Sequence, residues 1–456
     1  MQNTIKRCNQ LKKNGKPLDA LNEMQSFIKE NNKDFKAYIY AAEYAEACSN
    51  FDLAENYYQI AIKNETENAF FYLNFARYKL RRNLINESLN LFLKAYEIDN
   101  KSPLILTQMG RIFLIIGKTE KAAKYLEQAI LSNPKDPHPY YVLSLCYLRM
   151  GKYNEGWNLY KLRQAHIKWK NIGWGKINPL LFRMDSRWTG QDLRKKKIIV
   201  MPEQGFGDYL MCYRYVKALI KKYSCMVSIV CHPKLYELLN HSEDIDKVFS
   251  NQDEEFNTKH FDYDFWCTIF DLPVFLPEFK PYNFSFPYIE LKKTTYPKTK
   301  FSSKKPNIGI SWRGSSGHQN DFFRSIHCVE VLLDLVKDKK YNFFSLQYDL
   351  NSNEQDILGE HIKYDSSLLE GFENTANFIN RLDLIISVDT STIHLAGALN
   401  VPCWTLLPDF NVDWRWTDNA TETIWYKSVK LYRNSNREGW SELLKKVKLD
   451  LELEFI

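Results

Sequence analysis

The sequence predicts a helical-repeat region followed by two α/β domains, each built on a buried parallel sheet. Three observations predict this order. Small and large apolar residues recur every 34 positions through the first third of the 456-residue chain. From position 197 on, short apolar runs alternate with longer helical segments, which is typical of doubly wound α/β domains. A stretch rich in Lys, Thr, Ser and Pro, residues 294–306, separates two sets of such runs.

Composition and charge exclude several classes of protein. Hydrophobic residues make up 45% and charged residues 26%, a globular balance that excludes wholesale disorder. No apolar run approaches the roughly 18 residues of a spanning helix, and the N-terminus has no apolar signal core. Nine cysteines without a C-x-x-C pair favour free thiols in the cytoplasm over disulfides or a zinc site. A net charge of +7 is too mild for nucleic-acid binding, and residues 1–165 hold this excess, with 24 basic against 17 acidic residues.

Five copies of a 34-residue pattern occupy residues 1–165. A small residue recurs at Ala20, Ala54, Ser88, Ala122 and Gly156. Four positions later stands a large one, at Met24, Tyr58, Phe92, Leu126 and Tyr160. Five positions before the small residue stands a turn former, at Gly15, Ser49, Asn83, Gly117 and Gly151. The small residue lets two helices approach and the large one fills the groove between them. The pattern resembles the tetratricopeptide repeat, with central copies starting at Phe35, Ala69 and Pro103, and the fifth copy degrades at Arg163.

Stacked repeats of this type form a superhelix whose concave face is lined by the first helix of each repeat. The sixth positions of the central repeats are Tyr40, Asn74 and Gln108, and the ninth positions are Glu43, Arg77 and Arg111. Amide and guanidinium groups there would suit the backbone and acidic side chains of an extended peptide. A solvated helix face is an equally good interpretation, residue by residue.

The second half carries the strand pattern. Apolar runs bounded by turns lie at 198–201, 227–231, 308–312, 343–346, 384–388 and 403–407. We expect a Trp-rich ordered connector at 166–196, one Rossmann-like domain at 197–293, the linker at 294–306, and a second such domain at 307–456. In such domains ligands bind at the carboxyl ends of the strands, in the crevice between the two.

A glycine-containing loop follows the first predicted strand. It runs Glu203-Gln204-Gly205-Phe206-Gly207-Asp208 and leads into a helix. The loop is neither a complete G-x-G-x-x-G nor a P-loop, so dinucleotide and P-loop interpretations are weak. A carboxylate at the helix start can cap the helix or face the crevice, and both interpretations stay open for Asp208.

Two further loops carry anion-binding residue types. Asp389, Thr390, Ser391 and Thr392 follow the run 384–388, with His394 one helical turn on. Hydroxyls at a helix N-terminus suit a phosphate, and an ordinary Ser/Thr cap is the alternative. Arg313 and Arg324 flank a loop of small residues after the run 308–312, which suits a diphosphate clamp, with a solvated loop as the alternative.

Taken together, these stretches resemble the bacterial GT-B glycosyltransferases grouped with the ADP-heptose:lipopolysaccharide heptosyltransferases (family 9-like), in the subset that follows tetratricopeptide repeats. The matching stretches are 203–208, 312–314, 324–326, 345–347, 387–390 with 394–399, and 413–416. The domain order also resembles that of O-GlcNAc transferase and of the repeat-containing flagellin glycosyltransferases.

The resemblance implies an inverting, metal-independent transfer from a nucleotide sugar, with no cofactor. It assigns the general base to Asp208 and the acceptor loop to Glu203, Gln204, Gly205 and Gly207. It assigns the donor site to Asp389, Thr390, Ser391 and His394, the diphosphate contact to Arg324, and a place near the nucleotide to Gln347. Ser391 and the element Asp413-Trp-Arg-Trp416 depart from the heptosyltransferases, so the sugar stays open. Asp262-Tyr-Asp264 resembles a metal-binding D-x-D, and we interpret it as structural.

Three functions remain in competition. The first is a cytoplasmic glycosyltransferase whose acceptor is a protein held by the repeats; it needs no nucleic acid and no integral membrane segment. The second is a lipopolysaccharide or cell-surface glycan glycosyltransferase that uses its repeats for assembly. The third is a scaffold that does not catalyse. Intact Asp208, Arg324 and Asp389, and a charge excess confined to the repeats, favour the first.

Overall fold

The computed structural model describes residues 1–163, 184–253, 262–292, 304–434 and 439–455. The chain divides into two compact units. Unit 1 comprises residues 1–114 and 118–142, and unit 2 comprises residues 115–117 and 143–456. The boundary falls inside the helix Pro137–Arg149, so the fifth repeat is divided between the units. The predicted connector 166–196 and linker 294–306 lie largely outside the described residues.

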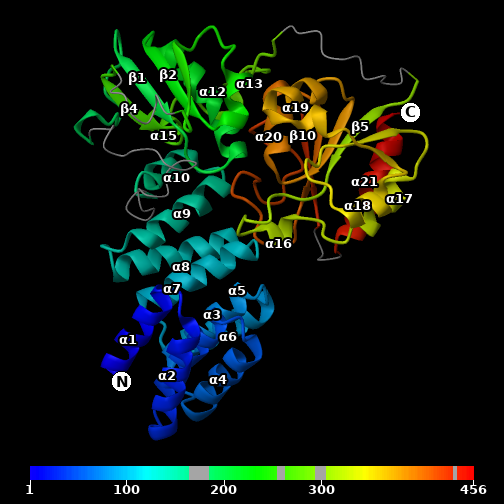
Figure 1. The fold of residues 1–456 in the computed structure, drawn as a ribbon. Coiled ribbons are helices and arrows are strands. Elements are labelled where there is room, and N and C mark those ends of the chain that lie inside the picture. The colour runs from blue at the N-terminus through cyan, green and yellow to red at the C-terminus, as the bar shows by residue number, and fades with distance from the viewer. Residues whose placement is uncertain (164–183, 254–261, 293–303, 435–438, 456) are drawn as a thin grey trace. The chain divides into compact units, whose positions relative to one another are not determined.

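Helices succeed one another along the repeat region (Figure 1). They are α1 (Gln2–Lys13), α2 (Pro17–Glu30), α3 (Phe35–Ala47), α4 (Phe51–Asn64), α5 (Ala69–Arg81), α6 (Ile85–Ile98), α7 (Pro103–Ile115), α8 (Thr119–Ser132), α9 (Pro137–Arg149) and α10 (Tyr153–Tyr160). The starts of α3, α5 and α7 coincide with the predicted starts of the central repeats. In unit 1 the pairs α1/α2, α3/α4 and α5/α6 pack against each other. The helical tetratricopeptide-repeat region is confirmed.

The packing of these helices follows the 34-residue pattern. All the predicted small and large positions are buried. At Gly110, an added Cβ would lie 2.4 Å from Leu126 Cγ, so a larger residue would push the two helices apart. The five turn positions have positive φ angles between 59° and 76°, a conformation that favours Gly and Asn.

A parallel sheet of four strands forms the first half of the α/β region. Its strands are β1 (Lys197–Met201), β2 (Met226–Cys231), β3 (Lys247–Ser250) and β4 (Phe265–Thr268), in the order β3-β2-β1-β4. Helices α12 (Phe206–Tyr223), α13 (Pro233–Leu239) and α15 (Asp271–Phe275) follow β1, β2 and β4. Strands β1 and β2 were predicted by their apolar runs. Strands β3 and β4, of four residues each, were not.

The second sheet has six parallel strands. They are β5 (Asn307–Ser311), β6 (Asn342–Ser345), β7 (Ile362–Lys363), β8 (Leu384–Val388), β9 (Cys403–Leu407) and β10 (Val429–Arg433), in the order β10-β9-β8-β5-β6-β7. Its helices are α16 (Asp321–Arg324), α17 (Leu333–Val336), α18 (Ser352–Leu358), α19 (Gly371–Ile379), α20 (Ser391–Leu399) and α21 (Gly439–Glu454). Helices α19 and α20 lie on one side of the sheet and α17, α18 and α21 on the other (Figure 1). Because both faces are covered, every residue of β5, β8 and β9 is buried.

Several smaller expectations have a structural outcome. Asp264 accepts hydrogen bonds from Lys197 N, at 2.8 Å, and Lys196 Nζ, at 3.1 Å, and Asp262 pairs with Lys197. These carboxylates lie where β1 and β4 begin, at the opposite ends of the strands from the predicted site. All nine cysteines are unpaired. Among the described residues, no helix combines the length and apolar character needed to cross a bilayer.

Candidate functional site

Loops that leave the carboxyl ends of β1, β5, β8 and β9 meet where α12 packs against α20. They bring together five charged side chains, which we call the charged cluster: Asp208, Arg324, Asp389, Asp413 and Arg415. Asp208 comes from the first sheet and the other four from the second. Parallel sheets place their carboxyl ends at one edge, so this position is where the fold class predicts a ligand.

Asp208 is tied to both sheets. It is the third residue of α12, and its Oδ2 accepts the Gly205 N–H at 2.8 Å, in a capping arrangement. Its Oδ1 pairs with the guanidinium of Arg415, which also donates to Asp413 Oδ1 at 2.7 Å. Burial and the charge of Asp413 raise the pKa of Asp208, and Arg415 opposes that rise. The side chain is 21% exposed, so this carboxylate is oriented and still reachable.

Gly207 and His394 form a close contact between the two halves of the site. A Cβ at Gly207 would lie 2.5 Å from His394 Cδ2. The His394 ring stacks on Trp416 with centroids 5.7 Å apart, and its Nδ1 lies 2.8 Å from the Tyr426 hydroxyl. Burial, aided by Arg415 and Arg214, holds the pKa of His394 well below its ordinary value, so the ring is neutral. His394 therefore packs against the 205–208 loop and presents little open surface.

Asp389 and the start of α20 lie beside this contact. Burial and Asp413 raise the pKa of Asp389 to about 6, against the lowering effects of Trp416, Arg324 and Arg415. Thr390 is the N-cap residue of α20, but its side chain makes no capping hydrogen bond. Its hydroxyl lies 3.3 Å from Ser387 Oγ, and Ser391 and Thr392 are half-buried. The helix start thus keeps the positive end of its dipole beside these hydroxyls.

Arg324 reaches the same place from α16. Its Nη1 donates to the Asp389 carbonyl at 3.1 Å, and the guanidinium lies across Gly314, where a Cβ would come within 2.3 Å of Nη2. Nε makes no hydrogen bond to the described residues and lies 3.6 Å from Asp321 Oδ1. The side chain is 13% exposed. Arg324 therefore lies close to Asp389 and Asp321, with one guanidinium donor that makes no hydrogen bond to the described residues.

Arg313 and Gln347 form a separate ionic group. The Arg313 guanidinium binds Glu354 through Nε, at 2.6 Å, and Nη2, at 2.9 Å, and it also contacts Asp349 at 3.0 Å. Gln347 accepts the Arg313 N–H at 3.3 Å and donates to Asp349 at 3.1 Å. Two carboxylates thus bind the Arg313 guanidinium, and its predicted contact with a diphosphate stays a prediction.

Glu203 and Gln204 anchor the start of the 203–208 loop through side-chain hydrogen bonds. Glu203 is buried and receives two hydrogen bonds from Arg163 at 2.8 Å and one from Thr268 at 2.6 Å. Arg163 also binds Asp271 at 2.8 Å. Gln204 has a positive φ of 62° and donates to the Tyr160 hydroxyl at 2.6 Å. Of the predicted acceptor loop, the segment Gly205–Asp208 therefore faces the charged cluster, and Glu203 does not.

Sequence reasoning missed two supports of the site. One is Arg163, whose only signal was that it broke the repeat pattern. The other is Arg415, which stood out as a charged residue between two tryptophans. Its neighbour Trp414 packs edge-to-face on Trp157 of α10, with centroids 5.5 Å apart. Arg149 of α9 donates to Asp418 at 2.7 Å and to the Val412 carbonyl at 3.0 Å, which fixes the same loop.

The residues predicted to line the concave face of the repeats differ in burial and in hydrogen bonding. Asn74 and Gln108 are buried. The Asn74 amide donates to the Phe70 carbonyl at 2.7 Å, and the Gln108 carbonyl oxygen accepts from Arg111 at 3.2 Å, so each amide already has a partner within unit 1. Arg77 is exposed and Arg111 half-buried. Burial and the nearby charge of Arg77 lower the pKa of Arg111. Arg77 and Arg111 therefore contribute positive charge to this part of unit 1.

Comparison with known proteins gives distant similarities. No family model matches the chain. Protein FlbA of Caulobacter vibrioides is 23% identical over 373 residues, which are 73% of this chain and 59% of FlbA, so the chain spans less than two thirds of that relative. The thermophilic TPR protein TTC0263 of Thermus thermophilus is similar in structure, with a TM-score of 0.32 and 21% sequence identity. The match covers 37% of this chain and 92% of that protein. PilF of Pseudomonas aeruginosa matches with a TM-score of 0.36, 15% identity, and 53% and 93% coverage.

Proposed function

We propose that unit 2 is an inverting glycosyltransferase of the GT-B type, which moves a sugar from a nucleotide sugar to a hydroxyl acceptor. The observation that carries this proposal is the pairing of Asp208, from the first sheet, with Arg415, from the second, beside Arg324 and Asp389. Of the motifs that resemble the heptosyltransferase group, 203–208, 324–326, 387–390 and 413–416 contain residues of the charged cluster, whereas 345–347 belongs to the separate group of Arg313 and Gln347. A fold alone does not fix a function, and the proposed activity therefore depends on the chemistry of these side chains.

The donor diphosphate would bind at the start of α20. Its oxygens would accept hydrogen bonds from the N–H groups of the helix start, the hydroxyls of Ser391 and Thr392, and the guanidinium of Arg324. When the bond between the anomeric carbon and the diphosphate breaks, the leaving group takes the electron pair and gains charge. A fixed dipole and a buried guanidinium stabilise that charge without a metal ion.

The acceptor hydroxyl would lie at Asp208. As its oxygen forms a bond to the anomeric carbon, its proton passes to the carboxylate, a contribution typically worth roughly 10²–10⁴-fold in rate. Burial favours proton uptake by Asp208, whereas Arg415 and Gly205 N hold the carboxylate charged and in one orientation. Arg415 is thus a positioning residue for the base. Inversion follows because the attacking and leaving oxygens lie on opposite faces of the sugar.

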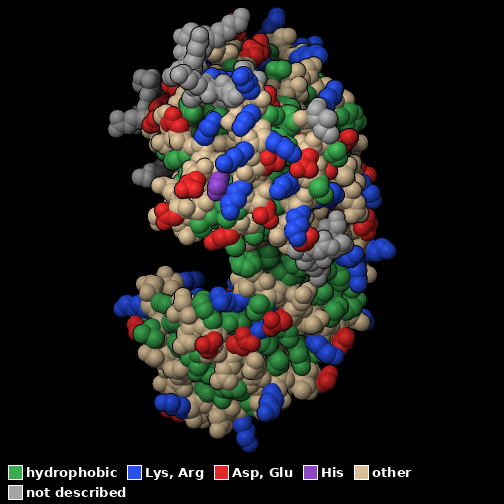
Figure 2. Space-filling view, turned by 90° about the vertical axis from the view of Figure 1, so that its right-hand side faces the viewer, with side chains coloured by type: hydrophobic (Ala, Val, Ile, Leu, Met, Phe, Trp, Pro, Cys, Tyr) green, Lys and Arg blue, Asp and Glu red, His purple; other side chains and the backbone are tan. Residues whose placement is uncertain are grey.

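We further propose that the acceptor is a protein bound by the repeats. The exposed Arg77 and its neighbour Arg111 give unit 1 a positive site suited to acidic side chains. A glycan-modifying enzyme that docks on a membrane would do so through a basic or apolar patch, whereas basic and acidic residues balance beyond position 165. On the face of the protein seen in Figure 2, Lys and Arg side chains are instead interspersed with Asp and Glu.

Binding of nucleoside diphosphates tests the donor half of the proposal. A panel of nucleotide sugars and diphosphates should identify one base by its thermal shift, and calorimetry should then give the dissociation constant. Arg324→Ala should weaken binding by about 1.5–3 kcal/mol, the range for a charged hydrogen bond. Arg194→Ala is the matched control, because Arg194 is 77% exposed and precedes the amino end of β1. Equal binding by Arg324→Ala and wild type would remove Arg324 from the donor site, and no binding from the whole panel would favour the scaffold.

A further inference from the structure

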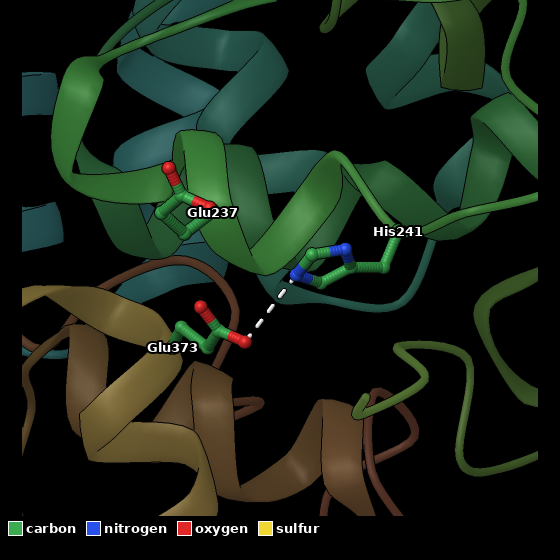
Figure 3. A group of neighbouring side chains, drawn as sticks. All are labelled: Glu237, His241 and Glu373. Atoms are coloured by element: carbon green, nitrogen blue, oxygen red, sulfur yellow. Dashed lines mark ion pairs between the residues drawn. The ribbon is translucent and has the colours of Figure 1, made fainter. Parts of the chain in front are cut away.

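Outside the charged cluster, Glu237, His241 and Glu373 bring three potential metal ligands together (Figure 3). Glu237 lies in α13 and His241 just beyond the end of that helix, whereas Glu373 lies in α19. One ligand atom from each residue lies within 4.8 Å of the others. The group therefore joins a helix that follows the first sheet to a helix of the second.

The imidazole is the central member of this group. In Figure 3 the His241 ring points toward the carboxylate of Glu373. Glu237 lies on α13, the helix that His241 follows. His241 Nε2 is buried, makes no hydrogen bond to the described residues, and lies 3.3 Å from Glu373 Oε1. His241 and Glu373 are 22% and 17% exposed, and Glu237 is exposed. A buried ring nitrogen thus faces a carboxylate without the geometry of a hydrogen bond.

This spacing suits a shared metal ion. Bonds of about 2.0–2.2 Å from zinc to nitrogen and oxygen, at tetrahedral angles, place neighbouring ligand atoms roughly 3.4 Å apart. The Nε2–Oε1 separation of 3.3 Å already has this value. The ligand atom of Glu237 lies within 4.8 Å of the other two, and its exposed side chain is not held by packing.

We propose that Glu237, His241 and Glu373 bind one divalent transition-metal ion, with Zn²⁺ the favoured species. One imidazole with two carboxylates suits zinc, and a fourth position stays open to water, whereas magnesium and calcium prefer oxygen ligands alone. The ion would clamp α13 to α19. Phe372, next to Glu373, packs on Phe206 with centroids 5.0 Å apart, so the clamp lies beside the loop that carries Asp208. Its role would be structural, separate from the proposed metal-independent transfer.

Calorimetric titration of the full chain with Zn²⁺, after removal of metals by a chelator, tests the site. Wild type should bind one ion. His241→Ala and Glu373→Gln should each weaken binding at least about tenfold, since even outer-shell partners of a metal site contribute roughly 10–100-fold. His361→Ala, which changes a half-buried histidine of the second sheet's domain, should bind as wild type does. Equal affinities for wild type and His241→Ala, or no saturable binding by wild type, would reduce the group to an ion pair and overturn the proposal.

Cobalt substitution identifies the ligands independently of stability. The Co²⁺ form should show visible d–d bands without the intense near-ultraviolet band of a cobalt–thiolate bond, because the three ligands are nitrogen and oxygen. A thiolate band would assign the ion to cysteine and refute the site. Zn²⁺ should also raise the melting temperature of wild type and not that of His241→Ala. Asp208→Asn should keep full metal binding, so failure of the proposed transfer and failure of this site give different results.

Discussion

Replacing Asp389 by Asn should make unit 2 more stable at neutral pH, although the residue is proposed to serve the donor site. Asp389 follows a fully buried strand, and its carboxylate is partly removed from water while it faces Asp413. Burial is the main reason that its pKa rises from 3.8 to about 6. Asparagine has nearly the same shape and no charge to desolvate. Active sites often retain such a group at the expense of stability.

The magnitude follows from the difference between the folded and unfolded pKa values. The folded state binds the proton more tightly, so the stabilisation by Asp389 is full below about pH 4 and is lost as the pH rises through about 6. At about 1.4 kcal/mol per pKa unit, the rise from 3.8 to about 6 corresponds to about 3 kcal/mol at pH 7. Asp389→Asn should therefore exceed wild type by up to about 3 kcal/mol at pH 7 and match it near pH 4.

Urea unfolding followed by tryptophan fluorescence measures this difference in unit 2 alone, because all 11 tryptophans lie at or beyond position 157. The difference between variant and wild type, measured from pH 4 to pH 7.5, cancels the titration of other groups. Asp383→Asn is the matched control, at the opposite end of β8. In wild type the Asp383 carboxylate accepts the Asn307 N–H at 2.7 Å, and an asparagine can accept the same hydrogen bond. This variant should therefore lower the free energy of unfolding by about 1 kcal/mol or less. An Asp389→Asn variant no more stable than wild type at pH 7, or a difference that does not change with pH, would refute this reasoning.

Three further predictions concern the supports of the site and the repeats. Arg163→Met should destabilise unit 2 by about 3–5 kcal/mol in urea unfolding, because it leaves Glu203 and Asp271 buried without their shared cation; a loss under about 1 kcal/mol would show that water replaces it. Gly207→Ala should cost about 1–3 kcal/mol, since the new Cβ meets His394, whereas Gly317→Ala, with its nearest neighbour at 3.8 Å, should stay within about 0.5 kcal/mol. Arg77→Glu combined with Arg111→Glu should reduce labelling of the natural acceptor in cell extract and leave slow donor hydrolysis unchanged; unchanged labelling would show that the repeats serve assembly only.

The repeat region could be predicted in detail because its information is local. Each helix pair repeats the same small residue, large residue and turn, and each turn needs a backbone conformation that few residues favour. The sheets were predicted in part. Strands β5, β6, β8 and β9 are short apolar runs, whereas β7 has two residues and β10 carries the exposed Lys430 between apolar neighbours. A search for continuous apolar runs cannot find such strands.

The site was harder to predict, because its ion pairs join distant parts of the chain. Asp208, Arg324 and Asp389 could be placed at one edge, since the ends of parallel strands meet there. The ion pair of Arg313 could not be predicted, because its partner Glu354 lies 41 residues away, in helix α18. The partner of Asp208 was missed for the same reason, since Arg415 is 207 residues distant.

The central claim, that the charged cluster transfers a sugar, is tested most directly by release of nucleoside diphosphate from a panel of nucleotide sugars. Wild type and Asp208→Asn should be compared at matched donor occupancy, with cell extract as the source of acceptor. We predict turnover by wild type with one nucleotide sugar, and a fall of at least about a hundredfold in Asp208→Asn with donor binding near wild type. Equal rates for the two proteins, or no release of diphosphate from any donor, would contradict the account.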